Sequence, residues 1–257
     1  MLMMKMILPR SYYNLLEATT ENNKWQDFEK ALGHFCDEME YHCLEDVGVI
    51  DSEGDIDSIK TERVKCDVCG NLFQSTELIK FFTEWIKKCV VTAIPKANFF
   101  KLINATADHF LTFNYTETLE ILYHVKNICH IHGKRGGNLI VGHGEAIRSF
   151  ILNEHGYGEG SDKAMYDIHE AFRKNTSQAL TTNISFFENL PNIHKIYSYG
   201  FSYSDVDMLY MKEICKKIAK NSIWYFNDYD CALHDIYKEK LIKCGFNGTF
   251  ATFNISD

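Results

Sequence analysis

The sequence predicts an α/β fold in which a mostly parallel sheet is covered by helices on both faces. Beyond residue 100, short apolar runs rich in Ile, Val, Tyr and Phe alternate with segments whose apolar residues recur every three or four positions. Such alternation is typical of parallel strands joined by helices. Before residue 100 the apolar spacing is helical. We therefore expect a helical cap or insertion over 1–100, packed beside an α/β core over 101–257.

The core is expected to alternate between strands and helices along its whole length. Strands are expected at 109–113, 127–132, 138–142, 194–199, 222–227 and 248–253. Helices are expected at 115–124, 162–189, 204–220 and 230–242. Since short apolar runs separated by helices are buried on both sides, the sheet they form is expected to be parallel.

The first 100 residues are expected to form a layer of helices. Apolar residues recur at helical spacing over 11–46 and again over 76–91, where Phe82 and Trp85 fall on the buried side. Residues 48–58 carry acidic and small side chains and predict a polar loop.

The composition favours a folded protein of the cytosol. In 257 residues the apolar fraction is 46% and there are only three prolines. No apolar run approaches the ~20 residues of a membrane helix, and the N-terminus is too short for a signal peptide. Nine cysteines without a secretion signal indicate reduced thiols. We therefore expect a cytoplasmic protein that does not enter a membrane.

The net charge of −8 is concentrated near the N-terminus. Residues 1–60 hold 13 acidic and 5 basic side chains, and the remainder is neutral. Because no basic stripe is present to neutralise phosphates, nucleic acid is not an expected partner. The acidic region is interpreted as a solvated helical layer in preference to a surface for a basic partner.

The most informative segment runs from His109 to His132. A strand, a helix and a second strand would deliver Asn114 and His132 to the same end of two neighbouring strands, where ligands bind in open parallel sheets. An asparagine both donates and accepts hydrogen bonds, and a histidine can take a proton at cellular pH. Gly133 would let the backbone approach a ligand closely. Alternatively, Asn114 only caps the following helix and His132 only bonds a carbonyl.

A second candidate segment is Y-S-Y-G-F-S-Y-S-D-V-D at 197–207. Gly200 would allow a tight turn, and Ser204 or Asp205 would begin a helix whose N–H groups can bind hydroxyls or phosphate. The simpler interpretation is a capping box between Ser204 and Asp207. The segment also resembles a nucleophile elbow around Ser202, but the second glycine of that motif is missing.

Metal binding is the weaker interpretation of the cysteines and histidines. Cys66 and Cys69 form half of a zinc motif, and no second C-x-x-C follows. The residues that could complete such a site are His34, Cys36, His42 and Cys43. His130 and His132 alternate on a predicted strand and would share one face with Ile131 opposite, but nearby sequence, His143 included, does not complete a ligand set. We expect no metal.

Together these motifs resemble the bacteriophage abortive-infection AbiH family, a relative of the sirtuin-like NAD-binding proteins. The specific part is Asn-Tyr-Thr at 114–116 with His-Ile-His-Gly at 130–133. The matching blocks are L-P-R-S-Y-Y-N-L-L at 8–16, W-Q-D-F-E at 25–29, F-L-T-F-N-Y-T-E-T-L-E at 110–120, C-H-I-H-G at 129–133, L-I-V-G-H-G at 139–144 and Y-G-F-S-Y-S-D-V-D at 199–207. The resemblance spans about residues 8 to 253.

The resemblance implies a Rossmann-like, sirtuin-like core that binds and degrades NAD. It implies that Asn114 holds the nicotinamide ribose and water and that His132 is the base. The other residues that the resemblance implies at the NAD site are Phe113, Tyr115, Thr116 and Gly133 around this pair, with Gly200, Ser202 and Asp205 along the adenosine half.

The resemblance also implies a glycine-rich loop of the type G-N-G-F-D shortly before the block at 8–16, and this sequence contains none. A truncated product, a misassigned start and a degenerate copy are the three interpretations. The sequence therefore leaves a third option, a zinc-stapled structural protein built on Cys66 and Cys69, behind two leading hypotheses. One is an anti-phage protein that hydrolyses NAD on infection, and the other is a non-catalytic module that senses a nucleotide or phage component and acts through a partner. The phage trigger and the oligomeric state, a homo-oligomer included, stay open.

Overall fold

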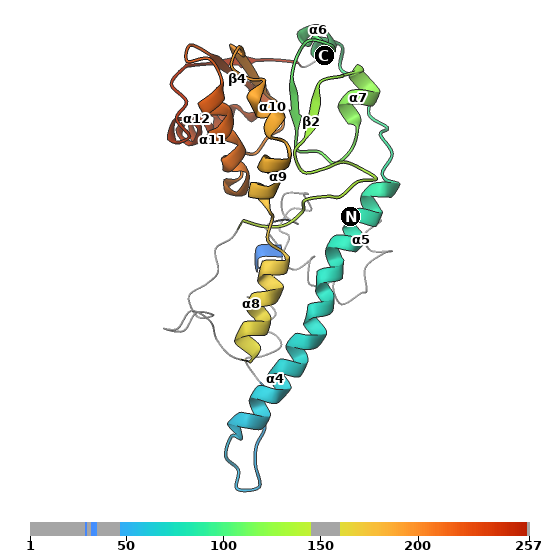
Figure 1. The fold of residues 1–257 in the computed structure, drawn as a ribbon, viewed down its shortest axis with the longest axis vertical. Helices are drawn as coiled ribbons and strands as arrows, with labels where there is room; N and C mark the ends of the chain where they lie inside the picture. The colour runs from blue at the N-terminus through green and yellow to red at the C-terminus, as the bar shows by residue number, and fades with distance from the viewer. Residues whose placement is uncertain (1–28, 30–31, 35–46, 145–159, 256–257) are drawn as a thin grey trace. The chain divides into compact units, whose positions relative to one another are not determined.

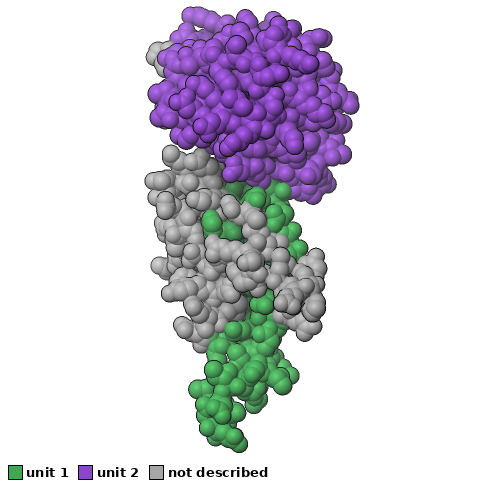
Figure 2. Space-filling view, turned by 90° about the vertical axis from the view of Figure 1, so that its left-hand side faces the viewer, with its two compact units in different colours: residues 1–88, 141–174 green, residues 89–140, 175–257 purple. Residues whose placement is uncertain are grey.

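The structure, a computed structural model, describes residues 29, 32–34, 47–144 and 160–255. The chain divides into two compact units, one made of residues 1–88 and 141–174 and the other of residues 89–140 and 175–257 (Figure 2). The region boundary expected near residue 100 stays a prediction, as does most of the helix expected at 11–46, which lies outside the described residues.

The unit of residues 89–140 and 175–257 contains the parallel strands (Figure 1). Its strands are β1 (Phe110–Thr112), β2 (Ile128–His130), β3 (Lys195–Ser198), β4 (Ile223–Asn227) and β5 (Thr249–Phe253). β1 pairs with β2, and β4 lies between β3 and β5, with every pair parallel. The predicted α/β, Rossmann-like fold with parallel strands is confirmed, with the strands in two hydrogen-bonded groups.

Helices connect and cover these strands. The helical elements of this unit are α6 (Ala97–Leu102), α7 (Thr118–Tyr123), α9 (Thr176–Thr182), α10 (Ile184–Glu188), the 3-10 helix η3 (Asp205–Asp207), α11 (Met208–Lys217), the 3-10 helix η4 (Asp228–Leu233) and α12 (His234–Lys243). α11 lies in the crossover between β3 and β4, and α12 lies in the crossover between β4 and β5. Each supplies buried side chains at helical spacing, Tyr210 and Ile214 in α11 and Tyr237 and Leu241 in α12.

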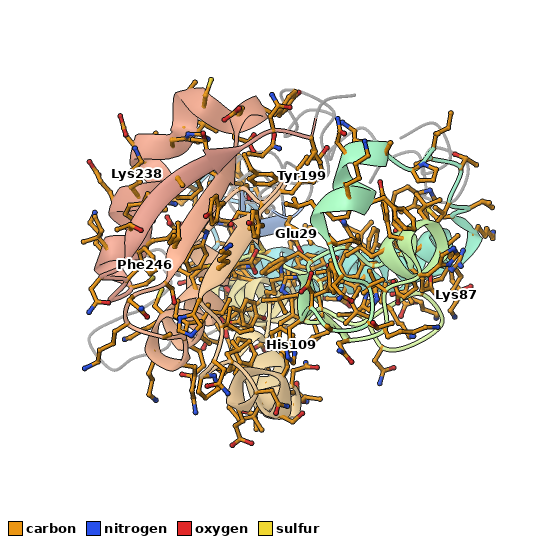
Figure 3. All side chains as sticks on the ribbon, turned by 90° about the horizontal axis from the view of Figure 1, so that it is seen from above. Glu29, Lys87, His109, Tyr199, Lys238 and Phe246 are labelled. Carbon is orange, nitrogen blue, oxygen red and sulfur yellow. The ribbon has the colours of Figure 1, made fainter. Side chains whose placement is uncertain are left out.

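Both strand groups contribute to one hydrophobic core. Ile131 follows β2 and is fully buried, and Trp224 and Phe226 of β4 are almost fully buried. Phe246, which is labelled in Figure 3, packs edge-on against Trp224, with ring centroids 5.4 Å apart. Burying such large rings outweighs the cost of ordering them and holds the ends of both strand groups in place.

Two sequence expectations for this region are wrong. The single helix expected at 162–189 is broken into α8 (Ser161–Ala171), α9 and α10. α8 ends at Ala171, and the side chain of Asn175 then accepts a hydrogen bond from the backbone of Gln178 and caps α9 as a new helix. The strand expected at 138–142 does not form, since Gly142 has a φ of +146° that a regular strand does not use.

The unit of residues 1–88 and 141–174 is mostly helical where it is described. Besides α8, its elements are α4 (Ser58–Phe73), the 3-10 helix η1 (Gln74–Glu77) and α5 (Leu78–Lys88). The helix expected at 76–91 is confirmed by α5, which buries Phe82. α4 was not predicted, because its own apolar pattern is weak. It is fixed by packing on α8, where Glu62 accepts a hydrogen bond from the backbone of Ser161 at 2.6 Å.

The polar loop expected at 48–58 is confirmed. It forms a short hairpin with one antiparallel bridge between Ile50 and Ile56. Within the described part of the chain, no helix combines the length and the apolar character needed to cross a membrane.

Candidate functional site

Asn114 and His132 emerge at the carboxyl ends of two paired parallel strands. Thr112 of β1 lies opposite His130 of β2 in the register, so each candidate residue follows its strand by two positions. The predicted placement of the two residues at the same end of neighbouring strands is confirmed. α7 lies between the two strands in the chain and makes their parallel pairing feasible.

His132 is 2% exposed and lies among aromatic rings. The ring of Phe113 meets it edge-on at 5.3 Å, and the rings of Tyr210 and Tyr115 lie 5.5 Å and 6.4 Å away between centroids. Its Nε2 atom lies 3.2 Å from Oδ1 of Asp207. The alternative was that the side chain of His132 only bonds a carbonyl. The structure shows instead that it lies beside a buried carboxylate.

Asp207 is the functional side chain that sequence reasoning missed. It ends η3 and is 7% exposed. The capping box expected between Ser204 and Asp207 does not form, since Ser204 makes no side-chain cap and only its carbonyl accepts from the Asp207 backbone, at 2.9 Å. The carboxylate turns toward His132 instead. The available signal was the acidic D-V-D directly before an apolar helix, in the segment already singled out.

Asn114 is exposed, and its backbone is held by two side chains. Its N–H donates to Oγ1 of Thr112 at 3.2 Å, and its carbonyl lies 3.1 Å from Nδ1 of His130. The alternative that Asn114 caps the following helix is wrong, because α7 begins after Glu117. The amide of Asn114 therefore stands in an exposed position at the strand end, where its residue type can serve a ligand.

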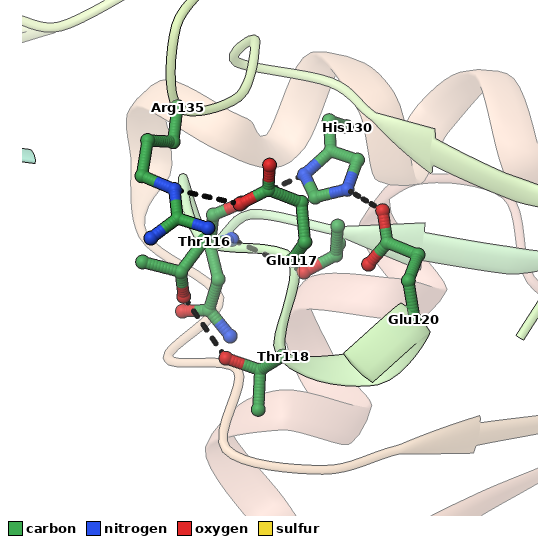
Figure 4. A network of polar contacts seen from close by, with 8 residues as sticks. Thr116, Glu117, Thr118, Glu120, His130 and Arg135 are labelled. Atoms are coloured by element: carbon green, nitrogen blue, oxygen red, sulfur yellow. Dashed lines mark hydrogen bonds and ion pairs between the residues drawn. The ribbon is translucent and has the colours of Figure 1, made fainter. Parts of the chain in front are cut away.

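A network of polar side chains surrounds this strand end (Figure 4). Glu120 of α7 contacts Nε2 of His130 at 2.8 Å, and Glu117 pairs with Arg135 at 3.1 Å. β2 ends at His130, so the strand alternation expected to place His130 and His132 on one face does not continue to His132. The two rings contact different carboxylates, Glu120 and Asp207.

The residues next to Asn114 have well-defined contacts. Phe113 stacks on Phe201 with ring centroids 4.3 Å apart. The buried Tyr115 donates its hydroxyl hydrogen to the carbonyl of Ile140 at 3.1 Å. The hydroxyls of Thr116 and Thr118 share a hydrogen bond of 2.9 Å. These contacts enclose the inner side of the strand end in aromatic rings.

The backbone conformation and the close packing at position 133 require a glycine. Its φ is +80°, and a Cβ atom built on it would lie 2.0 Å from the carbonyl oxygen of Asn138. The glycine therefore permits two backbone segments to approach each other directly after His132.

The loop after β3 carries the other predicted residues. Gly200 has a φ of +62° and is exposed, as is Ser202. Asp205 pairs with Lys240 at 2.7 Å. The loop contains no nucleophile elbow, since the left-handed residue is Tyr203, with a φ of +53°, and not Ser202.

Tyr203 holds this loop from inside. It is fully buried, and its hydroxyl lies 2.5 Å from Oγ of Ser198 and 2.9 Å from Nε1 of Trp224. Burial raises the pKa of this hydroxyl. A neutral tyrosine anchored to β3 and β4 thus fixes the start of η3, which presents Asp207.

The cysteines of the half-zinc motif lie on α4. Cys69 is fully buried with its sulfur 3.8 Å from the carbonyl of Ser161, and Cys66 contacts Glu62 at 3.6 Å. Among the residues that the structure describes, no group of three or more His, Cys, Asp or Glu side chains is placed to hold a metal ion. Cys36, His42 and Cys43 lie outside the described residues.

The fold and site define an α/β protein with an asparagine and a histidine at the carboxyl ends of paired parallel strands. The family model of bacteriophage abortive infection AbiH matches residues 3–228, so the chain belongs to the AbiH family. Membership implies a role in abortive infection, a defence against bacteriophage. Comparison with curated proteins and with solved structures finds no significant match.

Proposed function

We propose that this AbiH family protein hydrolyses NAD in the cytoplasm when a bacteriophage infects the cell. The observation that carries the proposal is the buried pair of His132 and Asp207 beside Asn114. Asn114 and His132 follow the carboxyl ends of two paired parallel strands. This is the edge at which open parallel sheets bind nucleotides and other ligands. The resemblance to sirtuin-like proteins supplies the substrate.

The chemistry requires one base and one orienting group. The bond between C1′ of the ribose and the nicotinamide nitrogen breaks, and nicotinamide, positively charged in NAD, leaves as a neutral molecule without a general acid. The ribose carbon becomes oxocarbenium-like and forms a bond with a water oxygen. The proton of that water passes to the base and then to solvent, and the products are nicotinamide and ADP-ribose.

His132 and Asp207 fit the roles of base and partner. Because Nε2 of His132 lies 3.2 Å from Oδ1 of Asp207, we assign the hydrogen of the neutral ring to Nε2, and Nδ1 is then the nitrogen that takes the proton. The buried carboxylate holds the ring in this tautomer and stabilises the imidazolium that forms. The Asn114 amide would orient the ribose hydroxyls and the water, because it donates and accepts at once.

Access to His132 depends on two aromatic rings. His132 is almost fully buried, and Phe113, which meets its ring, is itself stacked on Phe201. We infer that NAD reaches His132 when these two rings separate. In this arrangement, Tyr115, Thr116 and Gly133 would flank the nicotinamide ribose. The exposed residues Gly200, Ser202 and Asp205 would lie along the adenosine half.

The burial of His132 favours a second candidate function, a non-catalytic module that binds a nucleotide or phage component and acts through a partner. In that case the His132–Asp207 pair would hold the site together without reacting. Nucleotide binding without turnover, with phage protection retained in a His132→Ala variant, would select this function.

Release of nicotinamide from NAD tests the proposal directly. Purified protein is incubated with NAD and a lysate of phage-infected cells, and nicotinamide is followed by proton NMR. We expect turnover by the wild type and a loss of roughly 10²–10⁴-fold in His132→Ala. The matched control is His194→Ala. It removes an exposed histidine that directly precedes the amino end of β3, whereas the candidate site lies at the carboxyl ends of the strands. No release by the wild type under these conditions would contradict the proposal.

A further inference from the structure

His130 lies between two hydrogen-bond acceptors. It is the last residue of β2, and its side chain is 7% exposed. Its Nδ1 atom lies 3.1 Å from the carbonyl oxygen of Asn114, and its Nε2 atom lies 2.8 Å from Oε1 of Glu120 (Figure 4). The proposed reaction does not use His130 or Glu120, so their arrangement needs a reason of its own.

The chemistry of the two contacts fixes where hydrogens must lie. A carbonyl oxygen only accepts, so Nδ1 of His130 carries a hydrogen and donates it to Asn114. The contact between Nε2 and Glu120 requires one further proton, carried by the ring or by the carboxyl group. With either placement the ring is bound at both nitrogens, and it can neither flip nor rotate without breaking a contact.

The contact with His130 restricts the backbone of Asn114. Its carbonyl is held by His130 and its N–H by Thr112, so side chains fix the peptide groups on both sides of its Cα atom. Asn114 is exposed and follows a strand end, a position where a loop residue is ordinarily mobile. Holding these two peptide groups restricts the direction in which its amide side chain projects.

We propose that Glu120 and His130 form a positioning pair for Asn114. Glu120 fixes the ring of His130, His130 fixes the Asn114 carbonyl, and the Asn114 amide is thereby pre-organised for the ribose and the water. The expected effect on the rate of turnover rests on the proposed NAD hydrolysis, because that reaction is where Asn114 would orient the ribose and the water. Misplacement of such a group by about 1 Å costs roughly 10²-fold in rate.

The chain offers a matched control in the same network. Glu117 precedes α7 by one residue and forms an ion pair with Arg135 at 3.1 Å. Glu117→Gln removes one negative charge close to Glu120 and leaves the His130–Asn114 contact in place. Glu120→Gln keeps the contact in another form, because its amide can donate to Nε2 of His130.

A double-mutant cycle separates positioning from general structural support. In the wild-type background, Glu120→Ala is expected to lower kcat for NAD by roughly 10- to 100-fold. Glu120→Gln should recover most of that loss, and Glu117→Gln should stay within about twofold of the wild type. In an Asn114→Ala background, Glu120→Ala should change kcat by less than about twofold, because its effect passes through Asn114. Equal losses in the two backgrounds would overturn the proposal.

The carbonyl ¹³C resonance of Asn114 gives a readout that does not depend on turnover. His130→Phe, which fills the same space without ring nitrogens, and Glu120→Ala should both move this resonance, and Glu117→Gln should leave it in place. If the wild type releases no nicotinamide, the proposed function fails, and the resonance alone decides the positioning pair. A resonance that does not move in His130→Phe or Glu120→Ala would overturn the pair even if NAD is hydrolysed.

Discussion

Nε2 of His132 lies 3.2 Å from Oδ1 of Asp207, and the two side chains are 2% and 9% exposed. The histidine follows β2, and the aspartate ends the 3-10 helix after β3, so 75 residues of chain separate two groups that meet in the core. A carboxylate this close to a histidine orients the ring. In the proposed NAD hydrolysis His132 would be the general base and Asp207 its partner, with Asn114 at the adjacent strand end.

Replacing Asp207 tests whether the pair has a chemical role. Asp207→Asn keeps the shape of the side chain and removes its charge, so the imidazolium of the proposed reaction loses its partner. We expect kcat for NAD to fall by roughly 10²-fold. Asp235→Asn is the control, because it neutralises an exposed aspartate that pairs with a surface lysine across one helical turn. Unchanged turnover in Asp207→Asn, measured as nicotinamide release, would remove Asp207 from the mechanism.

Gly133 and Gly136 give a matched test of the turn after His132. Both have positive φ, +80° and +85°, but only at Gly133 would a Cβ atom meet backbone, at 2.0 Å from the Asn138 carbonyl oxygen. Gly136→Ala should cost about 1 kcal/mol of unfolding free energy for the left-handed conformation. Gly133→Ala should cost about 3 kcal/mol or more, because the clash is added. Urea unfolding of the two variants checks this, and equal losses would contradict it.

A part of the site could be predicted from the sequence where its position depends on residues close together in the chain. Asn114 and His132 were predictable because each directly follows a strand, and a strand, helix and strand in sequence place both at one sheet edge. Asp207 was not, because its partner comes from a segment far away in the chain, and its local sequence offered a plausible capping box that packing overrides. The Glu120–His130 contact was equally hidden, since it depends on where β2 ends.

The same distinction holds for the fold. The strands β3, β4 and β5 are short runs rich in β-branched and aromatic residues, so their positions were predicted within one or two residues, and of the three it is β4 that carries buried residues. The helix α4 carries too weak an apolar pattern to be recognised and is stabilised by α8, which follows it by some 90 residues. The strand expected at 138–142 was excluded by one backbone angle at Gly142.

Because of the buried side chain of His143, we expect the protein to lose stability in mild acid. It is 2% exposed, and its pKa is lowered to about 4, first by burial and then by the adjacent ring of His169. Nε2 of His143 donates to the carbonyl of His169 at 3.1 Å, a contact that raises the pKa of the ring and partly offsets the two lowering effects. Above pH 6.5 the ring is neutral in both the folded and the unfolded chain, and its contribution to stability is complete.

As the pH falls from 6.5 toward 4, the unfolded chain takes up a proton that the folded chain refuses, so the free energy of unfolding decreases. Each pKa unit is worth about 1.4 kcal/mol, and the loss approaches about 3 kcal/mol. Unfolding curves between pH 7.5 and pH 4.5 measure it. His143→Gln keeps a donor for the His169 carbonyl and should flatten this part of the profile. An identical decline in the variant would show that other groups cause it.

The most direct test of the central claim is the level of NAD in phage-infected cells that carry this protein. Wild-type cells, cells with His132→Ala and cells with His194→Ala are compared for NAD, nicotinamide and phage yield. If the protein hydrolyses NAD through His132, NAD falls and nicotinamide rises after infection in the wild-type and His194→Ala cells, and NAD persists in His132→Ala cells. NAD that stays constant in wild-type cells while the phage is still blocked would contradict NAD hydrolysis as the means of defence.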